Sequence, residues 1–186
     1  MDDRRVALDT DFINRITDFQ EGDPANFFCR LFQALDQEPV VHPYVAQFEL
    51  MHNSIAQRLM SNGSLTVIQY SEFLPENDDI ALRHYRQTFE DLYPKTSKML
   101  ALPKGLDIWS RHAKMSMGET HTILMAVTLG IPLFYSNDGG AKRGASYYRA
   151  GLLKVYNAEE VASLLNSSEQ ITGKERRFLS HYRSKG

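Results

Sequence analysis

The apolar positions near the start of the chain change from a continuous run to helical spacing. Residues 6–8 (Val-Ala-Leu) are consecutive apolar residues, which predicts a short buried strand. Across residues 12–19 the apolar side chains recur at helical spacing, which predicts an amphipathic helix. Asp23 and Pro24 are the residue types favoured at an N-cap and a first helical position. We therefore expect a second helix from there to about Leu35.

The same reasoning predicts the remaining elements. Further strands are expected at residues 39–41, 65–68, 131–135 and 152–155. Further helices are expected at residues 42–62, 76–92, 118–129, 139–150, 157–165 and from residue 172 onward. Residues 93–116 predict no element, because Pro94, Pro103 and Gly105 interrupt them.

Strands that alternate with helices indicate the fold class. We expect an α/β fold, a three-layer α/β/α sandwich with a mostly parallel central sheet of about five strands. In such folds, binding sites lie at the carboxyl ends of the strands, where the strand order reverses.

Composition narrows the class of protein. A length of 186 residues suits one domain. Cys29 is the only cysteine, so an intrachain disulfide is excluded, and its apolar neighbours predict a buried, inert thiol. Neither a signal peptide nor an apolar stretch of about 18 residues is evident, so we expect a soluble cytoplasmic protein without membrane contact.

Charge is distributed unevenly along the chain. Residues 1–97 carry 16 acids and 8 Lys or Arg, whereas residues 98–155 carry 3 acids and 8 Lys or Arg. The second segment could attract a phosphate backbone, or it could be an ordinary solvated surface.

Four carboxylates are candidates for chemistry. Asp9 and Asp138 each follow an apolar strand, Glu119 lies in a first helical turn, and Glu49 is flanked by apolar residues on a predicted helix. Each has an ordinary alternative reading as a turn, cap or helix residue. If they converge, their mutual repulsion requires a cation. Oxygen ligands suit Mg²⁺, and the chain has neither a cysteine cluster nor an HExxH motif for zinc.

Three segments resemble motifs of the PIN-domain family. Residues 6–13 (VALDTDFI) resemble its opening strand and Asp-Thr, and residues 45–50 (VAQFEL) its second acidic position. Residues 118–138 (GETHTILMA, then GIPLFYSND) resemble its C-terminal signature, with Glu119 in place of the commoner Asp. This resemblance implies a PIN-like nuclease domain over residues 1–165, with residues 65–117 as an enlarged helical insertion and residues 166–186 as a basic helical tail.

The resemblance also implies an activity, which is hydrolysis of RNA phosphodiester bonds by an endoribonuclease that uses Mg²⁺ or Mn²⁺. Its catalytic acids would be Asp9, Glu49, Glu119 and Asp138, with Asp9, Glu119 and Asp138 as metal ligands. Around them, Thr10 and Ser136 would orient carboxylates, Asp11 is a reserve acid or helix cap, and Asn137 is a candidate substrate contact. Three basic residues would hold the RNA backbone: Lys142, Arg143 and Arg149.

Other residues and partners follow from the same hypothesis. His121 is expected at the surface or beside the metal ligands, and Trp109 in packing. The expected partner is single-stranded or structured RNA. Further candidates are an antitoxin protein, as for the toxin of a toxin–antitoxin pair, and a second copy of the chain. Two alternatives remain: a catalytically silent PIN-like module that binds nucleic acid or protein, and a small-molecule-binding domain with an anion site at Gly139-Gly140.

Overall fold

A five-stranded parallel sheet forms the centre of the protein, in the order β3-β2-β1-β4-β5. This is a computed structural model, and it describes residues 4–75, 78–97, 99–112, 116–148, 151–165 and 168–181. The strands are β1 (Arg5–Leu8), β2 (Glu38–Val41), β3 (Thr66–Val67), β4 (Leu133–Tyr135) and β5 (Lys154–Tyr156). The central strand β1 pairs with β2 on one side and β4 on the other. The predicted α/β class with its parallel sheet is confirmed.

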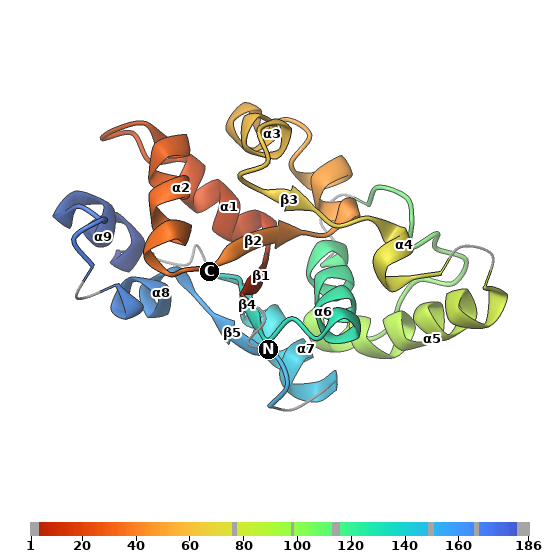
Figure 1. Cartoon of the computed structure of the whole chain (residues 1–186). Coiled ribbons are helices and arrows are strands. Elements are labelled where there is room, and N and C mark those ends of the chain that lie inside the picture. The colour runs from red at the N-terminus through yellow and green to blue at the C-terminus, as the bar shows by residue number, and fades with distance from the viewer. Residues whose placement is uncertain are drawn as a thin grey trace.

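Helices cover both faces of the sheet (Figure 1). One face carries α1 (Thr10–Thr17), α2 (Pro24–Ala34), α3 (Ser54–Ser61), α8 (Ala158–Leu164) and α9 (Gly173–Ser180). The other carries α4 (Tyr70–Phe73), α5 (Asp79–Thr96), α6 (Met117–Leu129) and α7 (Gly139–Tyr148). The predicted three-layer arrangement is therefore present.

The burial of β1 explains why Val6, Ala7 and Leu8 are consecutive apolar residues. Val6 and Leu8 pack into the core beneath α1 and α2, whereas Ala7 packs into the core beneath α6. Successive side chains of a strand point to opposite faces, and here both faces are buried. An uninterrupted apolar run is what a strand in this position requires.

The predicted long helix from residue 42 is wrong. The chain instead forms a short π-helix, η1 (Val45–Glu49), leaves helical geometry, and restarts at α3. Asn53 causes the restart: its side chain accepts a hydrogen bond from the Ala56 N–H at 2.9 Å and donates to Asn14 and Thr17 of α1. The hydrogen bonds of Asn53 with α1 therefore interrupt the helix that the apolar spacing predicted.

The segment after β3 also differs from the prediction. Helix α5 continues through Pro94 to Thr96, although Pro94 was expected to end it. Phe89, Leu92 and Tyr93 are fully buried in this helix, and their packing offsets the loss of one backbone hydrogen bond at the proline. Helix α4, which was not predicted, begins with a capping box between Gln69 and Glu72.

The C-terminal helix α9 packs on the same face of the sheet as α1 and α2. The predicted capping box at Thr172 is present, and Leu179 of α9 is fully buried in the core shared with α1 and α2.

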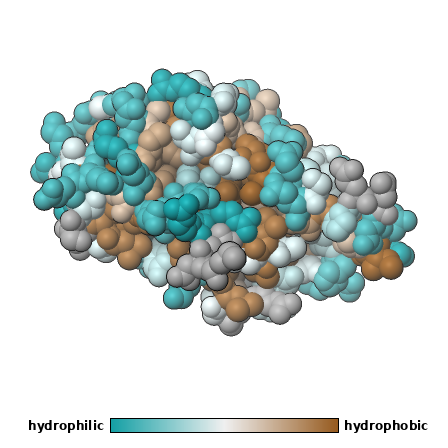
Figure 2. Space-filling model, in the orientation of Figure 1, coloured by the Kyte–Doolittle hydropathy of each residue, from teal (hydrophilic) through white to brown (hydrophobic). Residues whose placement is uncertain are grey.

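Cys29 is exposed, so its predicted burial is wrong; it lies on the outer side of α2. Figure 2 shows hydrophobic residues scattered among hydrophilic ones on one face. Ile80, near the start of α5, is 73% exposed. Within the described residues, no helix has the length and apolar character needed to span a membrane.

Candidate active site

Asp9 is the central residue of the acidic site. It follows β1, and its backbone N–H donates to the carbonyl of Tyr135 in β4 at 3.0 Å. One carboxylate oxygen accepts from the Thr10 N–H and the other from the Ser136 hydroxyl, both at 2.7 Å. Only 2% of the residue is exposed. The side chain is thus held rigidly at the carboxyl end of the central strand.

Asp138 lies beside it, after β4. The Ser136 hydroxyl that donates to Asp9 also accepts the Asp138 N–H at 3.1 Å. The Asp138 carboxylate accepts the Gly140 N–H at 2.6 Å, at the start of α7. Because β1 and β4 are neighbours, a single serine links the loops that carry these two acids.

Glu49 approaches from the π-helix on the β2 side. Its carboxylate accepts hydrogen bonds from the Thr10 hydroxyl and from the Gly118 N–H. A Cβ placed on Gly118 would lie 2.5 Å from each Glu49 oxygen, so the carboxylate rests on the glycine backbone. Glu119 is the next residue, in the first turn of α6. Gly118 therefore brings Glu49 and Glu119 to the same place.

The pKa values show that these groups interact. Burial raises the pKa of Asp9 well above its ordinary value, and the charges of Glu49 and Asp11 add to this effect. Burial likewise raises the pKa of Glu119, with contributions from Asp9, Glu49 and Asp138. Ionising one of these carboxylates makes ionising the others less favourable.

Asp11 and Glu49 belong to the same electrostatic group. Partial burial raises the pKa of Asp11, and the charge of Asp138 raises it further. Part of the residue is nevertheless exposed to solvent. Burial also raises the pKa of Glu49, while its hydrogen bonds with Thr10 and Gly118 oppose the rise. The four acids singled out in the sequence therefore lie within electrostatic range of one another, together with Asp11, the reserve acid.

The donor atoms suit a hard divalent cation. Carboxylate oxygens are the ligands that Mg²⁺ and Mn²⁺ prefer, and Mg²⁺ keeps several of its water molecules in protein sites. Within the described ranges, no set of three or more His, Cys, Asp or Glu side chains is placed to hold an ion directly.

The basic residues expected to hold RNA differ in their surroundings. The Lys142 ammonium lies 2.8 Å from both carboxylate oxygens of Glu160. A guanidinium nitrogen of Arg143 would lie 3.4 Å from a Cβ on Gly139, so Arg143 extends along the start of α7, beside Asp138. Arg149 lies outside the described residues.

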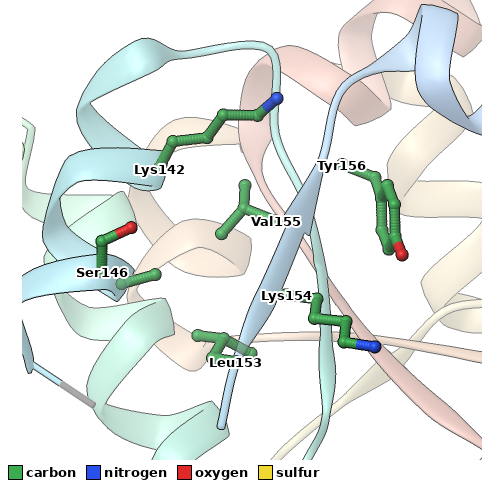
Figure 3. A pocket seen from close by; sticks show the side chains of 7 residues that line it. Lys142, Ser146, Leu153, Lys154, Val155 and Tyr156 are labelled. Carbon is green, nitrogen blue, oxygen red and sulfur yellow. The ribbon is translucent and has the colours of Figure 1, made fainter. Parts of the chain in front are cut away.

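Lys142 also borders a pocket between α7 and the edge strand β5 (Figure 3). The pocket has a volume of about 340 Å³. Lys142 and Ser146 reach into this region from α7, and Val155 points toward them from β5, whereas Lys154 and Tyr156 lie on the other side of the strand. Substrate binding by Lys142 stays a prediction, and Glu160 already neutralises its charge.

Two other predicted positions have structural partners. The Asn137 side-chain oxygen accepts the Ala158 N–H at 2.9 Å, which connects the loop between β4 and α7 to the start of α8. His121 is fully buried, so its expected place at the surface is wrong. Its ring nitrogens pair with the Tyr85 hydroxyl and the Ile108 carbonyl, each at 2.8 Å. Helix α6 is enclosed on nearly all sides, which leaves no exposed face for this residue.

The Gly139-Gly140 segment is not an open anion site. Asp138 already accepts the Gly140 N–H. A Cβ on Gly140 would also lie 2.1 Å from the Thr96 carbonyl oxygen at the end of α5. A carboxylate and a carbonyl therefore surround this backbone, and both would repel an anion.

The end of α5 packs beside the acidic site, a contact that the sequence did not predict. The Thr96 hydroxyl lies 2.5 Å from the Thr120 hydroxyl of α6, so the end of α5 adjoins the turn that carries Glu119. Burial raises the pKa of Tyr93 in α5, and the charge of Glu119 adds to it. No sequence pattern pointed to this contact, because residues 93–116 lack periodicity.

Comparison of the chain with models of known families finds no match, and neither do comparisons with curated proteins and with solved structures. The resemblance to the PIN-domain family therefore rests on the quoted motifs alone.

Proposed function

We propose that this protein is a metal-dependent endoribonuclease. The observation that carries the proposal is the convergence of Asp9, Glu119 and Asp138, with Glu49, at the carboxyl edge of the sheet. Burial raises the pKa values of Asp9, Glu49 and Glu119, so the ionised form of each carboxylate is disfavoured in the folded protein. A bound divalent cation would reverse this preference, and clustered acids with perturbed pKa values are typical of functional sites.

The residues would divide the work as follows. Asp9 and Asp138 would hold the ion, and Glu119 would hold it or orient a water molecule, with Glu49 completing the negative surface. When bound, Mg²⁺ or Mn²⁺ supplies activated water and neutralises charge that develops on the phosphate. Ser136 and Thr10 would keep the carboxylates in position through the hydrogen bonds described above. Arg143, beside Asp138, would contact the RNA backbone.

The decisive experiment is cleavage of a labelled single-stranded RNA by the purified protein with Mg²⁺ or Mn²⁺. Asp9→Asn and Asp138→Asn should each lower the cleavage rate by about 100-fold or more, because several kcal/mol of charge stabilisation depend on the ion. Asp18→Asn is the matched control, since this exposed acid lies at the opposite end of α1. Cleavage that persists in both site variants, or that needs no metal, would contradict the proposal.

A second candidate is a silent module that binds RNA without cutting it. This candidate is favoured because, among the described residues, no three His, Cys, Asp or Glu side chains are placed to hold one metal ion. RNA binding that is unchanged by chelation of metal, without any cleavage by the native sequence, would support it. The toxin hypothesis stays a prediction, and a neighbouring reading frame for a small DNA-binding protein would favour it.

A further inference from the structure

The loop between α5 and α6 is held against Tyr44, the residue before the π-helix, by a hydrogen bond. The His112 N–H donates to the Tyr44 hydroxyl at 3.2 Å, and a His112 ring nitrogen lies 2.7 Å from the Asp107 carbonyl. The Asp107 carboxylate accepts the Trp109 N–H at 3.1 Å and the Ser110 hydroxyl. These bonds fix the backbone on both sides of Arg111, whose own side chain is exposed.

Tyr44 relates this loop to Glu49. It lies directly before the π-helix that carries Glu49, and its ring packs 5.0 Å from that of Phe48. Burial raises the pKa of the Tyr44 phenol, the Glu49 charge adds to the rise, and the Arg111 charge opposes it. Arg111 and Glu49 thus both lie within electrostatic range of one hydroxyl.

The segments that carry Arg111 and Arg143 lie on opposite sides of the central strand β1. Glu49 and Arg111 are on the β2 side, Asp9 follows the central strand β1, and Arg143 is on the β4 side. The strands β2 and β4 are two spacings apart, about 10 Å. Within the described part of the chain, neither Arg111 nor Arg143 has an ion-pair partner, unlike Lys142.

We propose that Arg111 binds a phosphate of a single RNA strand that crosses the carboxylates from the β2 side to the β4 side, where Arg143 holds another phosphate. This inference rests on the proposed nuclease function and specifies how that site takes its substrate. A row of carboxylates alone repels a polyanion, and a guanidinium on each side offsets this repulsion through paired N–H donors. A strand held on both sides of the acids is cut internally.

Binding of RNA to Arg111 variants tests the inference. A fluorescent single-stranded RNA of about 12 nucleotides, comparable to known single-strand site sizes, is titrated in the Asp9→Asn background so that it stays intact. Arg111→Gln should weaken binding about tenfold and lower the slope of log Kd against log salt by about 0.7, the value for one lost single-strand phosphate contact. Arg111→Lys keeps the charge and should restore most of the slope.

Arg83→Gln is the control. Its side chain donates to the Asp79 carbonyl, and it lies about 20 Å along α5 from Thr96. Equal slopes for Arg111→Gln and Arg83→Gln would overturn the Arg111 assignment, and cleavage by the native sequence would leave the nuclease proposal standing. A lower slope without any cleavage would support the RNA contact and contradict the nuclease. Absence of measurable RNA binding would overturn both.

Discussion

The carboxylate of Glu49 lies directly against the Cα of Gly118, with each oxygen 2.5 Å from the place where a Cβ would be. The same carboxylate accepts the Gly118 N–H. A glycine at the start of α6 therefore lets an acid from the β2 side approach Glu119, the acid that follows it. No larger residue at position 118 leaves room for Glu49 where it now lies.

Gly118→Ala should displace Glu49. We expect slower RNA cleavage but little change in the free energy of unfolding, because the atoms that must move are the far end of the flexible Glu49 side chain. Urea denaturation and a cleavage assay measure the two effects. Gly173→Ala is the control, because a Cβ there has no neighbour within 4 Å. If both variants match the native protein, Glu49 is not held as described.

The contact between α5 and α7 depends on Gly140. Gly140→Ala would place a methyl group 2.1 Å from the Thr96 carbonyl oxygen, which belongs to the backbone and cannot turn away. We expect a loss of at least about 1–3 kcal/mol in the free energy of unfolding and a shift of Asp138. Gly139→Ala is the neighbouring control, since its Cβ would meet only an Arg143 nitrogen at 3.4 Å. Equal stability of the two variants would contradict the close packing.

The acidic site should make the metal-free protein less stable at higher pH. Burial raises the folded-state pKa values of Asp9 and Glu119, so the folded state holds protons that the unfolded chain has already released. The free energy of unfolding contributed by these groups is present below about pH 4 and is lost as the pH rises through the raised pKa values.

This pH effect can be measured by thermal denaturation without metal. Asp9→Asn removes one charge and should show a smaller loss of melting temperature toward pH 8 than the native protein. At pH 8, Mn²⁺ should raise the melting temperature of the native protein and have much less effect on Asp9→Asn, because binding to the folded state stabilises it. Identical pH profiles for the two proteins would show that Asp9 ionises normally.

Two buried histidines should have the opposite pH dependence. His42 and His121 are fully buried, with ring centroids 4.9 Å apart. Burial lowers the pKa of His121 to about 3, and burial together with His121 lowers that of His42. The unfolded chain takes up these protons below about pH 6.5 while the folded state does not, so stability falls with acidification by up to about 1.4 kcal/mol per pH unit for each histidine.

The slope of stability against pH tests this expectation. Urea denaturation between about pH 5 and 6.5 should give a slope for His121→Gln that is lower than the native slope by up to about 1.4 kcal/mol per pH unit. Loss of the hydrogen bonds with Tyr85 and Ile108 lowers stability at every pH, so the slope and not the absolute value is diagnostic. Exposed His52 supplies the control, His52→Gln. An unchanged slope in His121→Gln would show that this ring titrates normally.

Periodicity predicted most of the fold because local sequence and tertiary packing agree there. The strand at residues 6–8, the cap at Asp23 and the end of α6 at Gly130 are all where their residue types predicted them. Prediction failed where a distant partner decided the geometry. Asn53 interrupts a helical pattern because it bonds to α1, and Pro94 stays within α5 because its neighbours are buried.

For the acidic site, the sequence by itself determined that Asp9 and Asp138 follow apolar strands, and parallel strands place their carboxyl ends at one edge of a sheet. Only the tertiary structure decided that Glu49 rests on Gly118, that Lys142 pairs with Glu160, and that the loop carrying Arg111 docks on Tyr44. The physical reason is range. Periodicity and capping act over a few residues, whereas these contacts join residues 18 to 69 positions apart whose meeting depends on how whole elements pack.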